Sequence, residues 1–63
     1  MPFKIKEARK EKGFTQRELA KRANVSRATI FGLENGSITV TTTETLTKIA
    51  GALDKKVSDI FLA

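Results

Sequence analysis

Apolar residues recur along the chain at helical spacing rather than in alternation, and glycine, asparagine and threonine separate the apolar groups. The spacing predicts a first helix over residues 4–12, whose narrow apolar side contains Ile5 and Ala8, with Gly13 as the left-handed residue that ends it. Only residues 37–43 form a β-branched run, and no second run is available to pair with it. The pattern therefore predicts an all-α fold of short helices.

The second predicted helix has a clear start signal. Thr15 and Glu18 have the spacing of a capping box, in which the hydroxyl and the carboxylate each accept a hydrogen bond from a backbone amide at the helix start. Phe14 and Leu19 occupy the two staple positions around this box, so the direction in which the chain enters the helix is specified as well. We expect this helix to end near Ala23.

A third predicted helix follows almost at once. Ser26 is the next N-cap residue, and it begins a helix over residues 27–35 that ends at Gly36. Only Asn24 and Val25 remain for the turn, and asparagine tolerates the positive φ that so short a turn requires. Two short helices joined in this way cross at a steep angle, which predicts a helix-turn-helix.

Two more helices complete the predicted domain. Thr41 and Glu44 form a further capping box, so a fourth helix is expected to begin after Thr41. A short fifth helix is expected at about residues 57–61. The apolar residues that these two helices contribute at core spacing are Leu46, Ile49, Ala50, Leu53, Val57, Ile60 and Phe61. Residues 1–63 are thus predicted to form one five-helix domain.

The net charge is +5, and it is unevenly distributed. Residues 1–36 contain nine lysines and arginines against four glutamates, whereas residues 37–63 contain three basic and three acidic residues. An excess confined to one part of the chain favours a polyanionic partner, with nucleic acid as the first candidate and a membrane surface as the second. A charged surface that only keeps the protein soluble is the alternative.

Composition excludes several kinds of functional site. The chain contains no cysteine and no histidine, which excludes Cys/His zinc sites, Cys–His nucleophiles and Ser–His–Asp triads. No convergent set of nucleophile, base and metal ligands is left, so we expect no enzyme, no cofactor and no small-molecule ligand. The N-terminal residues lack a secretory signal, and no apolar stretch approaches the roughly 20 residues that span a bilayer. We therefore expect a cytoplasmic protein without a membrane partner.

The predicted third helix has an outward face that suits contact with another surface. Ile30 and Leu33 point toward the second helix, whereas the opposite face combines one cation, one aromatic ring and small or polar residues: Arg27, Ala28, Phe31, Gly32 and Asn35. Small residues let the helix backbone come close to a partner. Arg27 can donate two hydrogen bonds to a guanine, and Phe31 can contact a thymine methyl group. For Phe31, a dimer or core contact remains the alternative.

Four further polar residues are candidates for a role at this helix pair. Glu34 lies at the C-terminal end of the third helix, where a negative charge is unfavourable unless it is compensated. Arg9 lies near the buried side of the first helix, so an ion pair between Arg9 and Glu34 would satisfy both charges. Two separately solvated charges are the alternative. Gln16 and Arg17 occupy the first turn of the second helix, where backbone amides and the helix dipole attract a phosphate.

Together these residues resemble a known family. Residues 15–36, TQRELAKRANVSRATIFGLENG, resemble the helix-turn-helix of the Cro/C1-type, or XRE, repressors. The flanking segment IKEARKEKGFTQ resembles the first helix of that family, and ETLTKIAGAL and VSDIF resemble its last two, so the resemblance covers nearly the whole chain. The matching helix-turn-helix positions are Gln16, Ala20, Ala23, Val25, Ile30, Leu33, Glu34, Asn35 and Gly36.

The resemblance implies a compact five-helix, lambda-repressor-like DNA-binding domain. It implies a transcriptional regulator, usually a symmetric homodimer that binds a double-stranded operator with two half-sites. It also supports the pair of Arg9 and Glu34. The residues implied to face bases or their neighbouring phosphates are Ser26, Arg27, Ala28, Thr29, Phe31 and Gly32, and those implied to face phosphates are Gln16, Arg17, Asn35 and Ser37.

The chain departs from the family pattern at several positions. Asn24 replaces the usual turn glycine, which is tolerable. Residues 37–39 replace the basic residues that many members have after the third helix, which implies weaker phosphate contact there. Residues 54–56 precede the fifth helix with an unusual sequence, which implies poor capping. The sequence includes no sensor or cleavage domain, so we expect a small regulator that works alone, such as a phage-type repressor, a restriction-modification controller or an antitoxin.

A second functional hypothesis remains open at this point. The same fold can serve as a protein-interaction module that has lost DNA recognition, such as a dimerising partner or an anti-repressor. An apolar contact patch for that role would consist of Phe31, Ile38, Val40, Phe61 and Leu62. Salt-dependent binding to duplex DNA distinguishes the two hypotheses, because only a DNA-binding regulator requires it.

Overall fold

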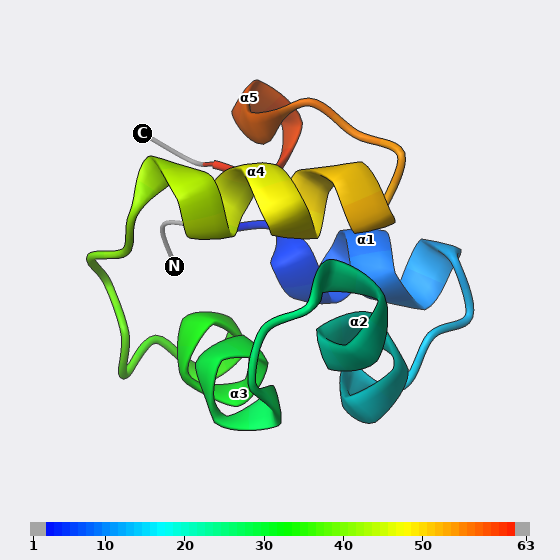
Figure 1. Cartoon of the computed structure of the whole chain (residues 1–63), viewed down its shortest axis with the longest axis horizontal. Helices are drawn as coiled ribbons and strands as arrows, with labels where there is room; N and C mark the ends of the chain where they lie inside the picture. The colour runs from blue at the N-terminus through cyan, green and yellow to red at the C-terminus, as the bar shows by residue number, and fades with distance from the viewer. Residues whose placement is uncertain (1–2, 62–63) are drawn as a thin grey trace.

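The computed structural model describes residues 3–61 and confirms the predicted all-α, five-helix fold. Figure 1 shows α4 lying across the domain, with α5 on one side of it and α2 and α3 on the other. The second and third helices have the predicted bounds. The helices are α1 (Ile5–Glu11), α2 (Gln16–Ala23), α3 (Arg27–Asn35), α4 (Thr43–Ala52) and α5 (Val57–Ile60).

Residues with left-handed backbone conformation end most of these helices. Gly13 and Gly36 have φ of 73° and 86°, and Asn24 has φ of 56°, as the sequence predicts. Asp54 also has φ of 56°, a conformation that the sequence did not lead us to expect. Helices this short are not stable through propensity alone. The turns that stop them therefore matter, because they bring the apolar sides of successive helices together.

Side-chain caps fix the starts of α2 and α3. Thr15 Oγ1 accepts from the backbone N of Glu18 at 3.0 Å, and Ser26 Oγ accepts from the backbone N of Thr29 at 3.1 Å. The second hydrogen bond of the predicted capping box at α2, from a backbone amide to the Glu18 carboxylate, is wrong. The carboxylate lies 3.2 Å from Arg22 Nη2 instead. A carboxylate in the first turn can serve either partner, and the arginine one turn later takes it here.

The start of α4 differs from the prediction by one residue. Thr42, rather than Thr41, is the N-cap residue, and its Oγ1 accepts from the backbone N of Thr45 at 3.1 Å. The predicted box of Thr41 and Glu44 is therefore wrong. Three consecutive threonines can each cap a helix, so the path of the preceding loop, and not the local sequence, selects among them.

The start of α5 is partly capped. No side chain caps the helix at Lys56, but Asp59 Oδ2 accepts from the backbone N of Lys56 at 2.9 Å. Poor capping was the expectation for this helix, and one hydrogen bond of the reciprocal pair is present. A carboxylate in the first turn also interacts favourably with the helix dipole.

The core lies between the helices, and large side chains from all five reach it. Those with the least exposure are Ile5, Leu19, Ile30, Leu33, Ile49, Leu53 and Ile60. The placement of Phe61 in the core is wrong, because 43% of this residue is exposed. Phe61 instead forms an antiparallel bridge with Phe3, whose ring centroid lies 5.6 Å from its own. Phe3 is the buried aromatic residue that the sequence analysis missed.

Candidate nucleic-acid interface

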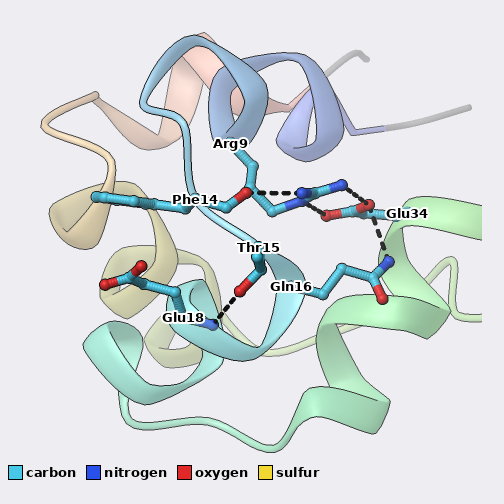
Figure 2. Close-up of polar contacts among 6 residues, drawn as sticks. All are labelled: Arg9, Phe14, Thr15, Gln16, Glu18 and Glu34. Atoms are coloured by element: carbon cyan, nitrogen blue, oxygen red, sulfur yellow. Dashed lines mark hydrogen bonds and ion pairs between the residues drawn. The ribbon is translucent and has the colours of Figure 1, made fainter.

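A buried network of polar side chains joins the first three helices. Arg9 Nε lies 2.7 Å from Glu34 Oε2, and Arg9 Nη2 lies 3.1 Å from Glu34 Oε1. The third nitrogen, Nη1, donates to the backbone carbonyl of Phe14 at 2.8 Å. Gln16 Nε2 donates to Glu34 Oε1 at 3.1 Å (Figure 2). The expected pair of Arg9 and Glu34 is thus present, and a bidentate pair of this kind fixes direction as well as distance.

Glu34 is the centre of this network. Its side chain is only 4% exposed, and both of its carboxylate oxygens accept hydrogen bonds. Because the donors come from α1 and from the first turn of α2, the carboxylate holds α3 in a defined orientation against both helices. The network also fixes Gln16 beside α3, since its amide nitrogen must face the carboxylate.

The outward face of α3 has few ties to the rest of the domain. Arg27, Ala28, Phe31 and Asn35 are exposed, and 56% of Phe31 is accessible to solvent. Arg27 forms no ion pair with any side chain between residues 3 and 61. Gln16, Arg27, Ala28 and Phe31 line one shallow, open hollow of about 500 Å³. A cation and an aromatic ring are therefore presented together, next to an amide from α2.

The structure corrects the predicted position of Gly32. This residue is buried rather than outward-facing, and the side chain of Ile38 covers it. The loop after α3 turns back here, since the backbone N of Ile38 donates to the Gly32 carbonyl at 3.0 Å. The helical projection puts Gly32 at the edge of the outward face, but it takes no account of a loop that returns over that edge. The geometric basis for a base contact at Gly32 is therefore lost.

Four predicted site residues shape the two ends of α3. The hydroxyl oxygens of Ser26 and Thr29 lie 2.8 Å apart, and Ser26 also caps the helix. At the other end, Asn35 Oδ1 accepts from the backbone N of Ser37 at 2.8 Å. Ser26, Asn35 and Ser37 are exposed, whereas Thr29 is half-buried. These side chains lie at the rim of the outward face, and part of their hydrogen-bonding capacity is used within the domain to stabilise the ends of α3.

Lys6 is a candidate site residue that the sequence analysis missed. It lines a second, smaller hollow of about 150 Å³ together with Gln16, Phe31 and Asn35, next to the buried pair of Arg9 and Glu34. Lys6 has no ion-pair partner among the side chains of residues 3–61, whereas Lys12, which directly follows α1, lies 3.0 Å from Asp54. The sequence could have indicated Lys6, because it precedes Arg9 by three residues and so lies on the same side of α1.

Arg17, by contrast, was correctly expected at the start of α2 and is exposed there. Arg22, one turn further on, is paired with Glu18 and lies over the Phe14 ring, with its guanidinium carbon 4.5 Å from the ring centroid. The two arginines of α2 therefore differ. One is held by its own domain, and the other extends from a helix start, where the dipole favours anions.

These features define a helix-turn-helix domain, and a family model described as Helix-turn-helix matches residues 5–60. The chain belongs to the Cro/C1-type, or XRE, helix-turn-helix family of DNA-binding transcriptional regulators. A comparison with curated protein sequences gives no match.

Solved structures of regulators resemble this domain closely. SinR of Bacillus subtilis, a master regulator for biofilm formation crystallised with DNA, is 35% identical, with a TM-score of 0.83 and 86% of each chain covered. A complex of the SinR and SinI proteins gives 34% identity and a TM-score of 0.84, over 87% of this chain and 53% of that one. ClgR, the clp gene regulator of Corynebacterium glutamicum, gives 34% identity and a TM-score of 0.79, over 87% and 57%.

The described helices and side chains also bear on membrane insertion and metal binding. Between residues 3 and 61, no helix has both the length and the apolar character needed to cross a membrane. In the same range, histidine, cysteine and acidic side chains form no group of three or more that could hold a metal ion.

Proposed function

We propose that the chain regulates transcription by placing the outward face of α3 in the major groove of double-stranded DNA. The observation that carries this proposal is the combination of an exposed Arg27 and an exposed Phe31 on a helix whose other side is locked by Glu34. SinR, a relative with the same fold, was crystallised with DNA, which supports the same partner here.

Base recognition is assigned to the N-terminal half of α3. Arg27 has the donor geometry for O6 and N7 of a guanine, and the Phe31 ring provides an apolar surface for a thymine methyl group. Ala28 lies between them in the same hollow and lets the helix approach the base edges. Ser26 and Thr29, at the start of the helix, contact the neighbouring phosphate or base with hydroxyls that also maintain the cap.

Phosphate contacts are assigned to the rim of this face. Gln16 and Arg17 contribute from the first turn of α2, where the backbone amides favour an anion. Asn35 and Ser37 contribute from the end of α3. Lys6 adds a cation from α1, beside the hollow that it shares with Phe31 and Asn35. These contacts set the register of the domain on the duplex, while the base contacts determine the sequence.

We further propose that the protein acts in the cytoplasm as a homodimer on an operator with two-fold symmetry. The half-exposed Phe61, whose ring packs on Phe3, is the first candidate for the subunit contact. Phe61→Ala should then lower the sedimentation mass at micromolar concentration and weaken operator binding. Val40→Ala removes a residue that is 86% exposed and serves as the matched apolar control. An unchanged mass for Phe61→Ala would disprove the assignment of this contact.

The first experiment is selection of bound sequences from a randomised duplex pool at moderate salt. A symmetric motif with half-sites about one helical turn, or ~10 bp, apart is expected for a dimer. Binding should weaken steeply as salt rises, because phosphate contacts release counterions. A failure to enrich any sequence, even at low salt, would contradict the proposal. It would favour the protein-interaction hypothesis, for which Phe31, Val40 and Phe61 are the residues to substitute first.

A further inference from the structure

Gly32 and Ile38 form a contact in which a side chain at residue 32 would displace the side chain of Ile38. A Cβ atom at Gly32 would collide with Cδ1 of Ile38 and stand 2.6 Å from its Cγ1 and 3.3 Å from Ser37 Oγ. The backbone N of Ile38 donates to the Gly32 carbonyl at 3.0 Å. Ile38 is half-buried and packs against the core. The loop therefore rests on the backbone of α3 at the one residue that has no side chain.

The position of this glycine is informative because glycine weakens a helix interior relative to alanine. Gly32 lies in the middle of α3, where its backbone is helical and needs no left-handed conformation. Gly51 in α4 provides the comparison, since a Cβ there would meet no atom within 4 Å. Space for the loop distinguishes the two residues, because a methyl group at residue 32 would force the Ile38 side chain to move, whereas one at residue 51 would displace nothing.

The loop that Gly32 admits begins beside the C-terminal half of α3. Gly32 lies one turn after Ala28, and residues four apart share a side of a helix. Ser37, next to Ile38, has its backbone N bonded to Asn35 Oδ1 at 2.8 Å. The contact of Ile38 with Gly32 and the hydrogen bond of Ser37 with Asn35 together hold the start of the loop beside α3.

We infer that Gly32 is a positioning residue for DNA binding, which acts by seating Ile38 and thereby holding Ser37 and the loop at the phosphate rim. The inference rests on the proposed function, and it replaces a direct base contact at Gly32 with an indirect role. The loop has no basic residue between Ser37 and Thr42, so its contribution depends on where its amides and hydroxyls are held. Neutral donors contact a phosphate only at short range and in the correct direction.

A double-variant experiment with Gly51→Ala as its control tests this inference. The unmodified protein, Gly32→Ala, Ile38→Ala and the double variant are compared for binding to the duplex selected above, at a temperature where each is folded. Gly32→Ala should weaken binding about 10-fold, because the displaced loop loses its phosphate contacts. Ile38→Ala removes the colliding atoms but also the side chain that Gly32 seats, so it should weaken binding by itself. The double variant should then bind within about 3-fold of Ile38→Ala and should not show the two losses combined. Gly51→Ala, in which the new methyl group meets nothing, should bind like the unmodified protein.

Two further readouts separate positioning from general loss of structure. The amide of Ile38 should be protected from hydrogen exchange in the free protein and lose that protection in Gly32→Ala. The slope of log K against log salt should stay unchanged in Gly32→Ala, because the amides and hydroxyls of this loop are neutral and release no counterions, whereas displacement of a lysine or arginine from a phosphate would make the slope shallower.

Unchanged binding and amide protection in Gly32→Ala would overturn the inference. So would losses that simply add in the double variant, which would instead indicate direct contact between Gly32 and DNA. If the unmodified protein bound no duplex, the proposed function would fail. Retained protection of the Ile38 amide in Gly32→Ala would then show, without any DNA, that Gly32 does not position Ile38.

Discussion

The two sides of α3 differ in how their charges are satisfied. On the inner side, Glu34 is buried, and Arg9 and Gln16 supply hydrogen bonds to both of its oxygens. On the outer side, Arg27 has no ion-pair partner between residues 3 and 61, and Phe31 is more than half exposed. One side of α3 is therefore fixed by hydrogen bonds inside the domain, and the groups on its other side are available to a partner.

This difference implies that stability and recognition depend on separate residues. A buried ion pair contributes defined geometry more than net stability, and it becomes costly when one partner is lost. An exposed arginine contributes little to folding, but it can gain two hydrogen bonds on a guanine. Substitutions on the inner side should change the free energy of unfolding, and substitutions on the outer side should change the affinity for DNA.

The largest effect is expected on the inner side. Glu34→Ala leaves Arg9 without its carboxylate in a site where only 12% of the arginine side chain is exposed. The free energy of unfolding should fall by about 3 kcal/mol, which is a large fraction of the stability of a domain this small. Urea denaturation monitored by circular dichroism measures the change.

Glu44→Ala is the matched control for this substitution. Glu44 also belongs to a helix and pairs with a lysine, at 3.6 Å, but its side chain is 80% exposed. Its removal should cost less than about 1 kcal/mol. Equal losses for the two variants would mean that the buried network contributes no more than a surface pair.

On the outer side, Arg27→Ala should have the largest effect on binding. Affinity for the selected duplex should fall by about 1–3 kcal/mol, with relaxed preference at one base pair. The free energy of unfolding should change by less than about 0.5 kcal/mol. Lys56→Ala removes the same charge at the N-cap of α5 and should leave the sequence preference intact. This helix lies on the opposite side of α4 from α3 (Figure 1). A uniform loss across all duplexes would make Arg27 a phosphate contact instead.

A smaller effect is expected for the aromatic ring beside Arg27. Replacing thymine by deoxyuracil in the selected duplex removes a methyl group, which is worth about 0.8 kcal/mol if Phe31 buries it. The loss should be seen with the unmodified protein and be absent with Phe31→Ala, as measured by titration of each duplex. If both proteins lose the same affinity, the methyl group contacts a different residue.

The smallest effect is expected for Lys6, at the border between the two sides. Lys6→Ala should make the slope of log K against log salt shallower by about 0.9, the value for one phosphate contact on duplex DNA. Lys12→Ala, a substitution in the residue that follows α1 and whose side chain pairs with Asp54, should leave the slope unchanged. Identical slopes for all three proteins would remove Lys6 from the interface.

Features that depend on neighbouring residues were predictable from the sequence. The caps at Thr15 and Ser26 and the turn at Asn24 all act within a few residues, and the structure has them as predicted. The start of α4 was displaced by one residue because adjacent threonines are equivalent caps. The second partner of Glu18 was missed for a related reason, since two local partners compete for one carboxylate.

Features that depend on residues far apart in the chain were harder to predict. Gly32 was expected on the outward face because a helical projection ignores the loop that returns over it. Lys6 was missed because its place beside the outward face of α3 depends on how close α1 lies to α3. The pair of Arg9 and Glu34 could be predicted although the two residues are 25 positions apart in the chain, because each charge was unfavourable alone and the signs were opposite.

The bridge between Phe3 and Phe61 has a consequence for chain topology. The backbone N of Lys4 donates to the carbonyl of Ile60 at 2.7 Å, so the two ends of the described segment are held side by side. Such proximity permits circular permutation. A short linker between the two bridged ends, with new chain ends created between Val40 and Thr41, would keep all five helices and the contact of Ile38 with Gly32. In the permuted chain α4 and α5 would precede α1, and the order in which the helices can begin to fold would change.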